Sequence, residues 1–162
     1  MRGQITGMRG VYLVAAELSR HGFIASPTSR SAMAADILVT DQACQNAFTV
    51  QVKTNARATT FWLLGKNTPM SDRHIYVFVN IRQHDHADVP EYYVVPSRFV
   101  SEHTTYEKRP NSEWWSVSLK DISAWKDKWD LFGDPKGELK VEERSISREV
   151  QAPEDAQPPS PS

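Results

Sequence analysis

Cysteine is nearly absent from this chain, because Cys44 is the only one among its 162 residues. A single cysteine excludes an intramolecular disulfide and a zinc site built from several cysteines. Cys44 has no motif around it, so a catalytic thiol has no support in the sequence.

Signatures of several other protein classes are also missing. The chain has no apolar run near 20 residues and no basic segment followed by an apolar one, which argues against a membrane span and a signal peptide. It has no Gly-rich phosphate loop and no nucleophile elbow, so a small-molecule enzyme has little support. With 40% hydrophobic and 24% charged residues, the composition is typical of a globular protein. We expect one compact, cytoplasmic domain.

Excess charge is lacking as well, since the formal net charge is −1. The charge is unevenly spread: residues 134–162 hold seven acidic and four basic side chains, which leaves 15 basic against 13 acidic in residues 1–133. The first part is therefore about +2, a weak footprint for a nucleic-acid binder, so any such affinity depends on local clusters. We expect a folded domain over residues 1–133 and a charged, then Pro/Ser-rich tail over 134–162. That tail is expected to be disordered from about residue 145, because it has too little apolar surface to bury.

Hydrophobic periodicity predicts a mixed α/β fold. Apolar residues at helical spacing predict a helix over 8–21 that ends at Gly22. Pro96 begins a second predicted helix that ends near residue 103, and Asp121 a third, whose apolar face holds Ile122, Trp125 and Trp129. Strands are predicted over residues 23–27, 36–41, 48–53, 74–81, 91–95 and 114–119, the last as an edge strand.

The segment from Phe48 to Thr54 has two polar residues on an otherwise apolar strand. Alternate side chains of a strand share a face, so Gln51 and Lys53 project together. If residues 36–41 and 48–53 form a hairpin with its loop at 41–46, pairing Thr40 with Ala47 places Asp36 opposite Gln51. Asp36, Gln51 and Lys53 are then expected to converge.

These three groups suit the chemistry of phosphodiester hydrolysis. A carboxylate and an amide oxygen are hard donors that suit Mg²⁺, which takes one or two protein carboxylates and keeps several waters. A neighbouring lysine can orient or help deprotonate the attacking water, or offset the charge that builds on the phosphorus. Glu17 on the first helix can hold a metal-bound water or a second ion, or simply face solvent.

The order of these residues, an acid on a helix, then an acid on a strand and then Gln-x-Lys on the next strand, resembles the pattern of the PD-(D/E)XK nuclease superfamily. The resemblance is to the branch with Gln in the first position of the E-x-K motif, as in some restriction and homing endonucleases and Holliday-junction resolvases, and it spans about residues 7–103. It implies a restriction-endonuclease-like α-β-β-β-α-β core, with a mixed central sheet flanked by helices and here an added C-terminal helix. Asp36 matches the metal-binding aspartate, Gln51 the variable acid, Lys53 the lysine and Glu17 the helix acid.

The resemblance also departs from the family pattern at two positions. Ala35 stands where the motif has Pro, which has no ligand role, and Gln51 removes one negative charge from the site. The implied activity is a Mg²⁺-dependent deoxyribonuclease, with Mn²⁺ as a substitute, in which Asp36, Gln51, the Val52 carbonyl and Glu17 bind metal. Its implied partners are duplex or branched DNA and a second copy of the chain. The alternative is an inactive nuclease-fold module that binds DNA or protein in a defence, repair or mobile-element system.

Basic residues outside the motif are candidates for phosphate contacts or ordinary solvated charges. We expect Arg9, Arg30, Arg57 and Lys66 to contact nucleic acid, with Arg20 and Arg73 as further candidates. The segment His84-Asp85-His86 with Asp88 resembles a metal cluster, but its composition favours a loop. The tryptophans can stack on unpaired bases, although their spacing favours core packing.

Overall fold

The computed structural model describes residues 2–29, 35–85 and 87–138. Arg30, His86 and the tail expected to be disordered from about residue 145 lie outside these residues. The described part is a mixed α/β fold, which confirms the predicted class. No helix in the described ranges combines the length and the apolar character that a membrane span requires.

The first helix, α1, spans Arg2–Arg20 and so begins six residues earlier than predicted. Its buried stripe holds Val11, Val14 and Leu18, the helical spacing seen in the sequence. Gly22 follows the helix with a φ of 91°, a conformation that favours glycine. The helix therefore ends where the sequence predicted.

A five-stranded sheet forms the centre of the molecule, in the order β1-β2-β3-β5-β6. The strands β3 and β5 are parallel and the other pairs are antiparallel, so the sheet is mixed. The strands span Ile24–Pro27 (β1), Ile37–Thr40 (β2), Ala47–Asn55 (β3), His74–His84 (β5) and Ala87–Pro96 (β6).

The pairing between β2 and β3 confirms the predicted hairpin register. Thr40 lies opposite Ala47, and the loop between them covers residues 41–46. The buried Asp41 carboxylate holds this loop, because it accepts hydrogen bonds from the backbone N–H groups of Gln45 and Asn46 at 3.0 and 2.9 Å. Cys44 is an exposed residue of this loop.

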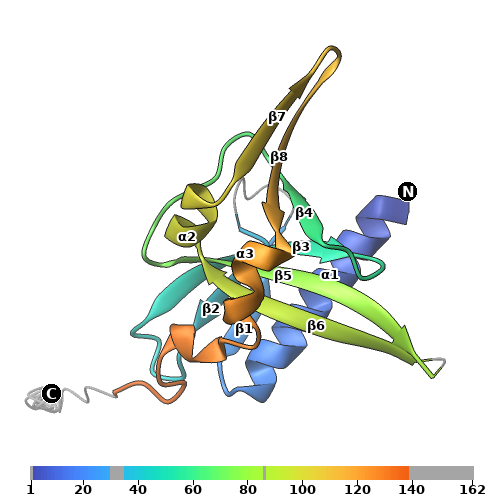
Figure 1. The fold of residues 1–162 in the computed structure, drawn as a ribbon. Helices are drawn as coiled ribbons and strands as arrows, with labels where there is room; N and C mark the ends of the chain where they lie inside the picture. Colours follow the sequence, from blue (N-terminus) through green and yellow to red (C-terminus); the bar gives the residue numbers. More distant parts are fainter. Residues whose placement is uncertain (1, 30–34, 86, 139–162) are drawn as a thin grey trace, which may run out of the picture.

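A second, three-stranded antiparallel sheet has the order β4-β8-β7. Its strands span Phe61–Leu64 (β4), Thr105–Arg109 (β7) and Ser112–Ser118 (β8). The prediction that residues 114–119 form an edge strand was wrong, because β8 lies between β4 and β7. The strand β7 lacks a buried side and thus an apolar pattern, so nothing marked it in the sequence. The β7–β8 hairpin projects from the rest of the molecule (Figure 1).

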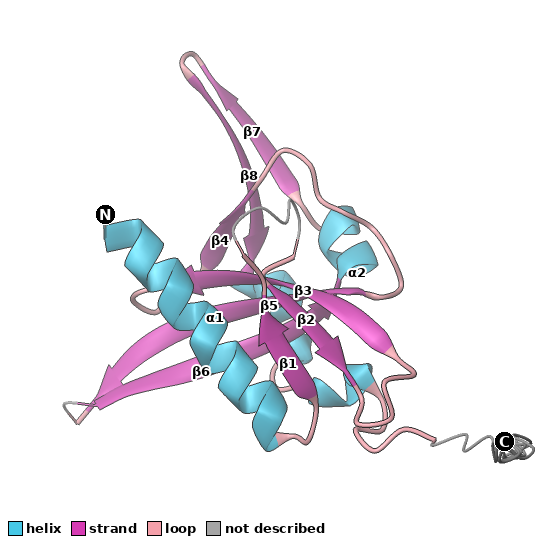
Figure 2. Cartoon of the chain, turned by 180° about the vertical axis from the view of Figure 1, so that it is seen from behind, coloured by secondary structure: helices cyan, strands magenta, loops and turns pink. Residues whose placement is uncertain are grey.

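Two hydrophobic cores lie on opposite faces of the five-stranded sheet. On one face α1 packs on Val50 and Val52 of β3 (Figure 2). On the other face Tyr76 and Phe78 of β5 pack against Trp62 of β4 and against residues of β8 and two short helices. These helices are α2 (Ser97–Glu102) and α3 (Leu119–Ile122).

The predicted third helix is wrong in its length. The chain after α3 forms two 3₁₀ turns, η1 (Ser123–Trp125) and η2 (Trp129–Phe132). Between them Lys126 forms a β-bridge with Tyr93, and Asp127 has a φ of 54°. A left-handed residue interrupts an α-helix, so the apolar spacing of Trp125 and Trp129 belongs to two turns.

Candidate active site

The side chains of β3 divide cleanly between the two faces of the sheet. On the α1 face, Thr54 touches the helix so closely that a Cβ added at Gly10 would lie 1.7 Å from its Oγ1. Neighbouring strand residues point to opposite faces, so Lys53 points away from α1. Gln51 and Lys53 lie beside Tyr76 and Phe78 of β5 in the parallel register, which are core residues of that second face. We call this surface the site face.

Asp36 and Gln51 meet on the site face, as the predicted register requires. The Gln51 side chain donates from Nε2 to the Asp36 carboxylate at 3.1 Å, and the Val52 backbone N–H donates to the same oxygen, Oδ2, at 2.8 Å. The Asp36 backbone N–H donates in turn to the Val50 carbonyl at 2.8 Å. Asp36 is therefore fixed to β3 through both its backbone and its side chain, immediately before β2 begins.

Lys53 shares the site face with this pair and is half-buried. None of the ion pairs formed among the described residues involves Lys53. A lysine without a carboxylate partner keeps its charge and donors available for a ligand. The structure thus places three of the four predicted catalytic residues on one surface.

His74 is a residue of the same surface that the sequence analysis did not identify. It begins β5 beside Thr49, whose Oγ1 lies 2.8 Å from His74 Nδ1. Only 4% of His74 is exposed, and its Nε2 has no hydrogen-bond partner among the described residues. Burial lowers the pKa of His74, while the negative charge of Asp36 opposes that change. The only sequence signal was a histidine at the start of an apolar strand, a pattern that fits simple core packing equally well.

The structure does not bring Glu17 to Asp36. The Arg20 side chain donates to the Glu17 carboxylate at 2.6 Å, and His21 Nε2 lies 3.5 Å from it. The hydrogen bond from Arg20 lowers the pKa of Glu17. Glu17 also lies near Tyr92 of β6. Burial raises the pKa of Tyr92 to about 12, and the negative charge of Glu17 is the second cause of this rise. The physical reason is that α1 packs on the face opposite Gln51 and Lys53.

The donors on the site face suit a metal ion that is shared with a substrate. No group of three or more histidine, cysteine or acidic residues that could hold a metal occurs within the described ranges. Asp36 is thus the one carboxylate of the predicted metal set that lies on the site face. Its Oδ1 makes none of the described hydrogen bonds, and Gln51, which donates through Nε2, keeps its Oε1 as an acceptor. Mg²⁺ accepts one carboxylate when waters and phosphate oxygens complete its shell, so these residues fit Mg²⁺.

The predicted phosphate-contacting residues are scattered around the fold. Arg9 donates to Asp88 at 2.8 Å, so its charge is already paired. Arg57 lines a cavity near the end of β3, and Lys66 lines an open depression beside Trp115. Arg30 lies outside the described residues. Of the two further candidates, Arg20 is bound to Glu17, while Arg73 lies 5.0 Å from the centre of the Phe48 ring.

Comparison with known proteins gives weak similarity to solved structures. No family model matches the chain, and no curated protein matches it. Among solved structures, the chain is similar to Hjc, a Holliday junction resolvase from the archaeal hyperthermophile Archaeoglobus fulgidus. The TM-score is 0.45 and the sequence identity 12%, over 79% of this chain and 96% of that chain. With a TM-score this low, the function has to be inferred from the chain's own residues.

Proposed function

We propose that this protein is a metal-dependent DNA endonuclease that hydrolyses phosphodiester bonds. The observation that carries the proposal is the contact of Asp36 with Gln51 and the Val52 N–H, with Lys53 on the same face of the sheet. This is the arrangement expected for an acid followed by Gln-x-Lys. The same residues support membership of the PD-(D/E)XK superfamily as part of the proposal.

Each residue has a distinct role in this proposal. Asp36 Oδ1, Gln51 Oε1 and the Val52 carbonyl would hold Mg²⁺, or Mn²⁺ in its place. The bound ion would polarise a phosphoryl oxygen and lower the pKa of a coordinated water. Lys53 would orient the attacking water and offset the negative charge that develops on the phosphoryl group. We leave Glu17 out of the site, since Arg20 holds it on the other side of the sheet.

The single carboxylate has a consequence for metal affinity. A site with one formal negative charge attracts a divalent cation less strongly than a site with two. Substrate phosphates then supply the missing charge, so metal and DNA should bind cooperatively. We propose duplex or branched DNA as the partner and the cytoplasm as the location. Cutting both strands requires two sites, which a homodimer would provide.

A second candidate function is an inactive nuclease-fold module that binds DNA or protein. The neutral Gln51 favours it, together with the position of Glu17 on the opposite face of the sheet. Such a module need not bind metal or depend on Lys53. Defence, repair and mobile-element systems are settings in which a module of this kind would act.

Cleavage assays on supercoiled plasmid and on a four-way junction test the proposal. Wild-type protein should nick at least one substrate with Mg²⁺ or Mn²⁺ and neither with EDTA. Asp36→Ala should abolish cleavage, Lys53→Ala should lower the rate by about 10²-fold or more, and Gln51→Glu should retain activity. Asp72→Ala and Lys120→Ala, at exposed positions with no proposed role in the site, are the matched charge controls and should cleave normally. Metal-independent cleavage, or cleavage unchanged in Asp36→Ala, would contradict the proposal.

A further inference from the structure

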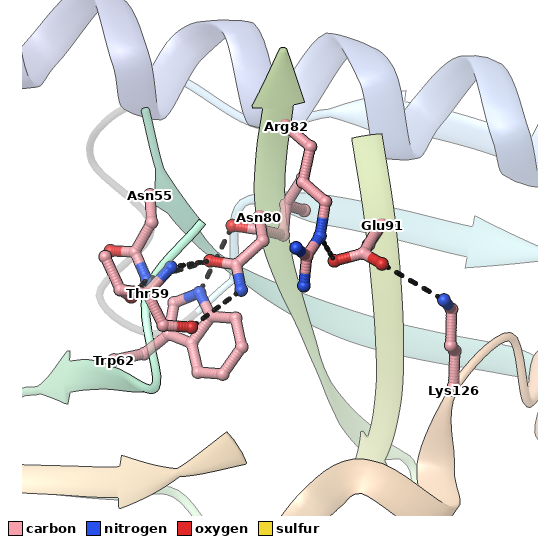
Figure 3. Close-up of polar contacts among 8 residues, drawn as sticks. Asn55, Thr59, Trp62, Asn80, Arg82, Glu91 and Lys126 are labelled. Atoms are coloured by element: carbon pink, nitrogen blue, oxygen red, sulfur yellow. Dashed lines mark hydrogen bonds and ion pairs between the residues drawn. The ribbon is translucent and has the colours of Figure 1, made fainter. Parts of the chain in front are cut away.

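A fully buried asparagine lies at the end of the site face. Asn80 of β5 is 0% exposed and lies opposite Asn55, the last residue of β3. Its Nδ2 donates to the Thr59 carbonyl at 2.9 Å, and its Oδ1 accepts from Asn55 Nδ2 at 3.2 Å and from the Thr59 N–H at 3.4 Å (Figure 3). Each polar atom of the Asn80 side chain therefore has a partner, and those partners belong to the ends of one loop.

The loop that these bonds hold runs from residue 56 to residue 60. Asn55 Nδ2 also donates to Thr59 Oγ1 at 2.6 Å and to the Phe61 carbonyl at 3.0 Å, which closes the loop upon itself. The residues at its centre, Ala56, Arg57 and Ala58, are exposed, with no large apolar side chain to anchor them. Hydrogen bonds to Asn80 thus replace apolar packing as the element that fixes the loop.

A cavity of about 470 Å³ opens between this loop and the end of β5. Arg57 and Ala58 line one side, and residues 81–83 of β5 line the other. Arg82 pairs with Glu91, and Glu91 also pairs with Lys126 at 3.1 Å, so one carboxylate serves two cations (Figure 3). Arg57 has no acidic partner within the described ranges. The cavity therefore has a net positive lining.

The backbone on this side of β5 is also open. Pairing of β3 with β5 ends at Asn55 and Asn80, whereas β5 continues to His84. The edge of β5 beyond Asn80 therefore carries no strand on its β3 side among the described residues. Backbone N–H groups on such an edge are donors for an anion. A guanidinium together with free backbone donors is a combination that recognises phosphate.

We propose that this cavity binds a phosphodiester group of a nucleic-acid strand, with Arg57 as the binding cation and Asn80 as its positioning residue. The proposal deepens the proposed function, since Arg57 follows Lys53 by four positions in the chain. These four steps span at most roughly 14 Å, while a DNA strand advances about 3.4 Å per nucleotide along its axis. The bound phosphate is therefore only a few nucleotides from the scissile one.

DNA binding in EDTA tests the subsite without any cleavage. Fluorescence anisotropy with a labelled 20-base-pair duplex at several salt concentrations gives the affinity and its salt dependence. Arg57→Ala should weaken binding roughly tenfold and lower the slope of log K against log salt by about one. Arg109→Ala, which removes an exposed, ion-paired arginine of the β7–β8 hairpin, is the matched control and should leave both values unchanged.

A double-mutant cycle tests the positioning role of Asn80. Asn80→Asp replaces the donor to the Thr59 carbonyl with an acceptor. Thr59→Val keeps both bonds to Asn80 but removes the hydroxyl that accepts from Asn55, so it loosens the same loop and keeps the test of loop positioning valid if Asn80→Asp fails to fold. Each should lower DNA affinity and the salt slope in the wild-type background. Neither should change them further in the Arg57→Ala background. A merely structural role would lower the melting temperature and leave the salt slope unchanged.

The outcomes separate this inference from the proposed function. If Arg57→Ala binds DNA like the wild type, or if the wild type binds no DNA, the subsite is refuted whatever the cleavage result. If the wild type cleaves no substrate but Arg57→Ala lowers the DNA affinity and the salt slope, the subsite stands and the nuclease proposal fails. If Asn80→Asp lowers the DNA affinity equally in the wild-type and in the Arg57→Ala background, the positioning role is refuted.

Discussion

Gly10 gives the sharpest stability test of the packing that directs Lys53 away from α1. A Cβ at this position would lie 1.7 Å from Thr54 Oγ1 and 2.8 Å from Thr54 Cβ. Rotation of the threonine side chain can move Oγ1, but the position of its Cβ is set by the β3 backbone. Gly10→Ala therefore requires α1 and β3 to move apart.

The expected magnitude follows from two opposing effects. Overpacking of a well-packed contact costs about 1–3 kcal/mol, whereas Gly→Ala in a helix interior contributes about 1 kcal/mol of stability. We expect a net loss of about 1–2 kcal/mol. For a chain of this size, each kcal/mol corresponds to about 2–4 °C in melting temperature. Gly10→Ala should therefore melt about 2–8 °C below the wild type.

The helix provides its own control at Gly7. A Cβ at Gly7 would meet no atom within 4 Å, so Gly7→Ala should raise the melting temperature by helix propensity alone. Thermal and urea denaturation of both variants measure the difference. If Gly10→Ala is as stabilising as Gly7→Ala, α1 does not lie against Thr54 and the assignment of faces fails.

Three further predictions concern single residues. Burial depresses the pKa of His74 below 6.5 in the folded protein, with Asp36 opposing the shift, so stability should be complete above about pH 6.5 and fall as the pH drops below it. Melting curves of His74→Phe between pH 7.5 and 5 should lack that part of the decline, and an unaltered decline would show that His74 does not cause it. Glu17→Gln should cleave DNA at a rate within about twofold of the wild type, whereas a loss near that of Asp36→Ala would return Glu17 to the site. Trp62→Phe should lower the free energy of unfolding by roughly 1–3 kcal/mol, because the buried Val79 carbonyl loses the indole N–H that donates to it at 3.2 Å; urea denaturation with no change in stability would refute this.

The hairpin and its polar residues were predictable because their signals are local. Strand alternation and a six-residue loop determine the register of Thr40 with Ala47, and that register brings Asp36 to Gln51. The first helix was equally readable, since Val14 and Leu18 repeat at helical spacing and are both fully buried. In each case the pattern that stabilises the element lies within the element.

Features that depend on distant partners were not predictable. Glu17 flanks the apolar stripe of α1, and nothing in the sequence says that α1 covers the face opposite Gln51. Asn80 was one polar residue in an apolar strand, and its role depends on a loop 21 residues away. The broken third helix depends on the pairing of Lys126 with Tyr93, a tertiary contact that helical spacing does not encode.

Calorimetric titration of Mn²⁺ into the wild type and Asp36→Ala, with and without a DNA duplex, tests the central claim most directly. The titrations with DNA use Ca²⁺ in place of Mn²⁺ and a non-hydrolysable phosphorothioate duplex. Metal binding is then measured without cleavage of the DNA. The wild type should bind the metal more tightly with DNA present, Lys53→Ala should bind at least as well because a nearby positive charge is gone, and Asp36→Ala should bind neither metal. A wild-type protein that binds no divalent metal even with DNA, or an Asp36→Ala variant that binds it equally well, would contradict a metal-dependent nuclease built on Asp36.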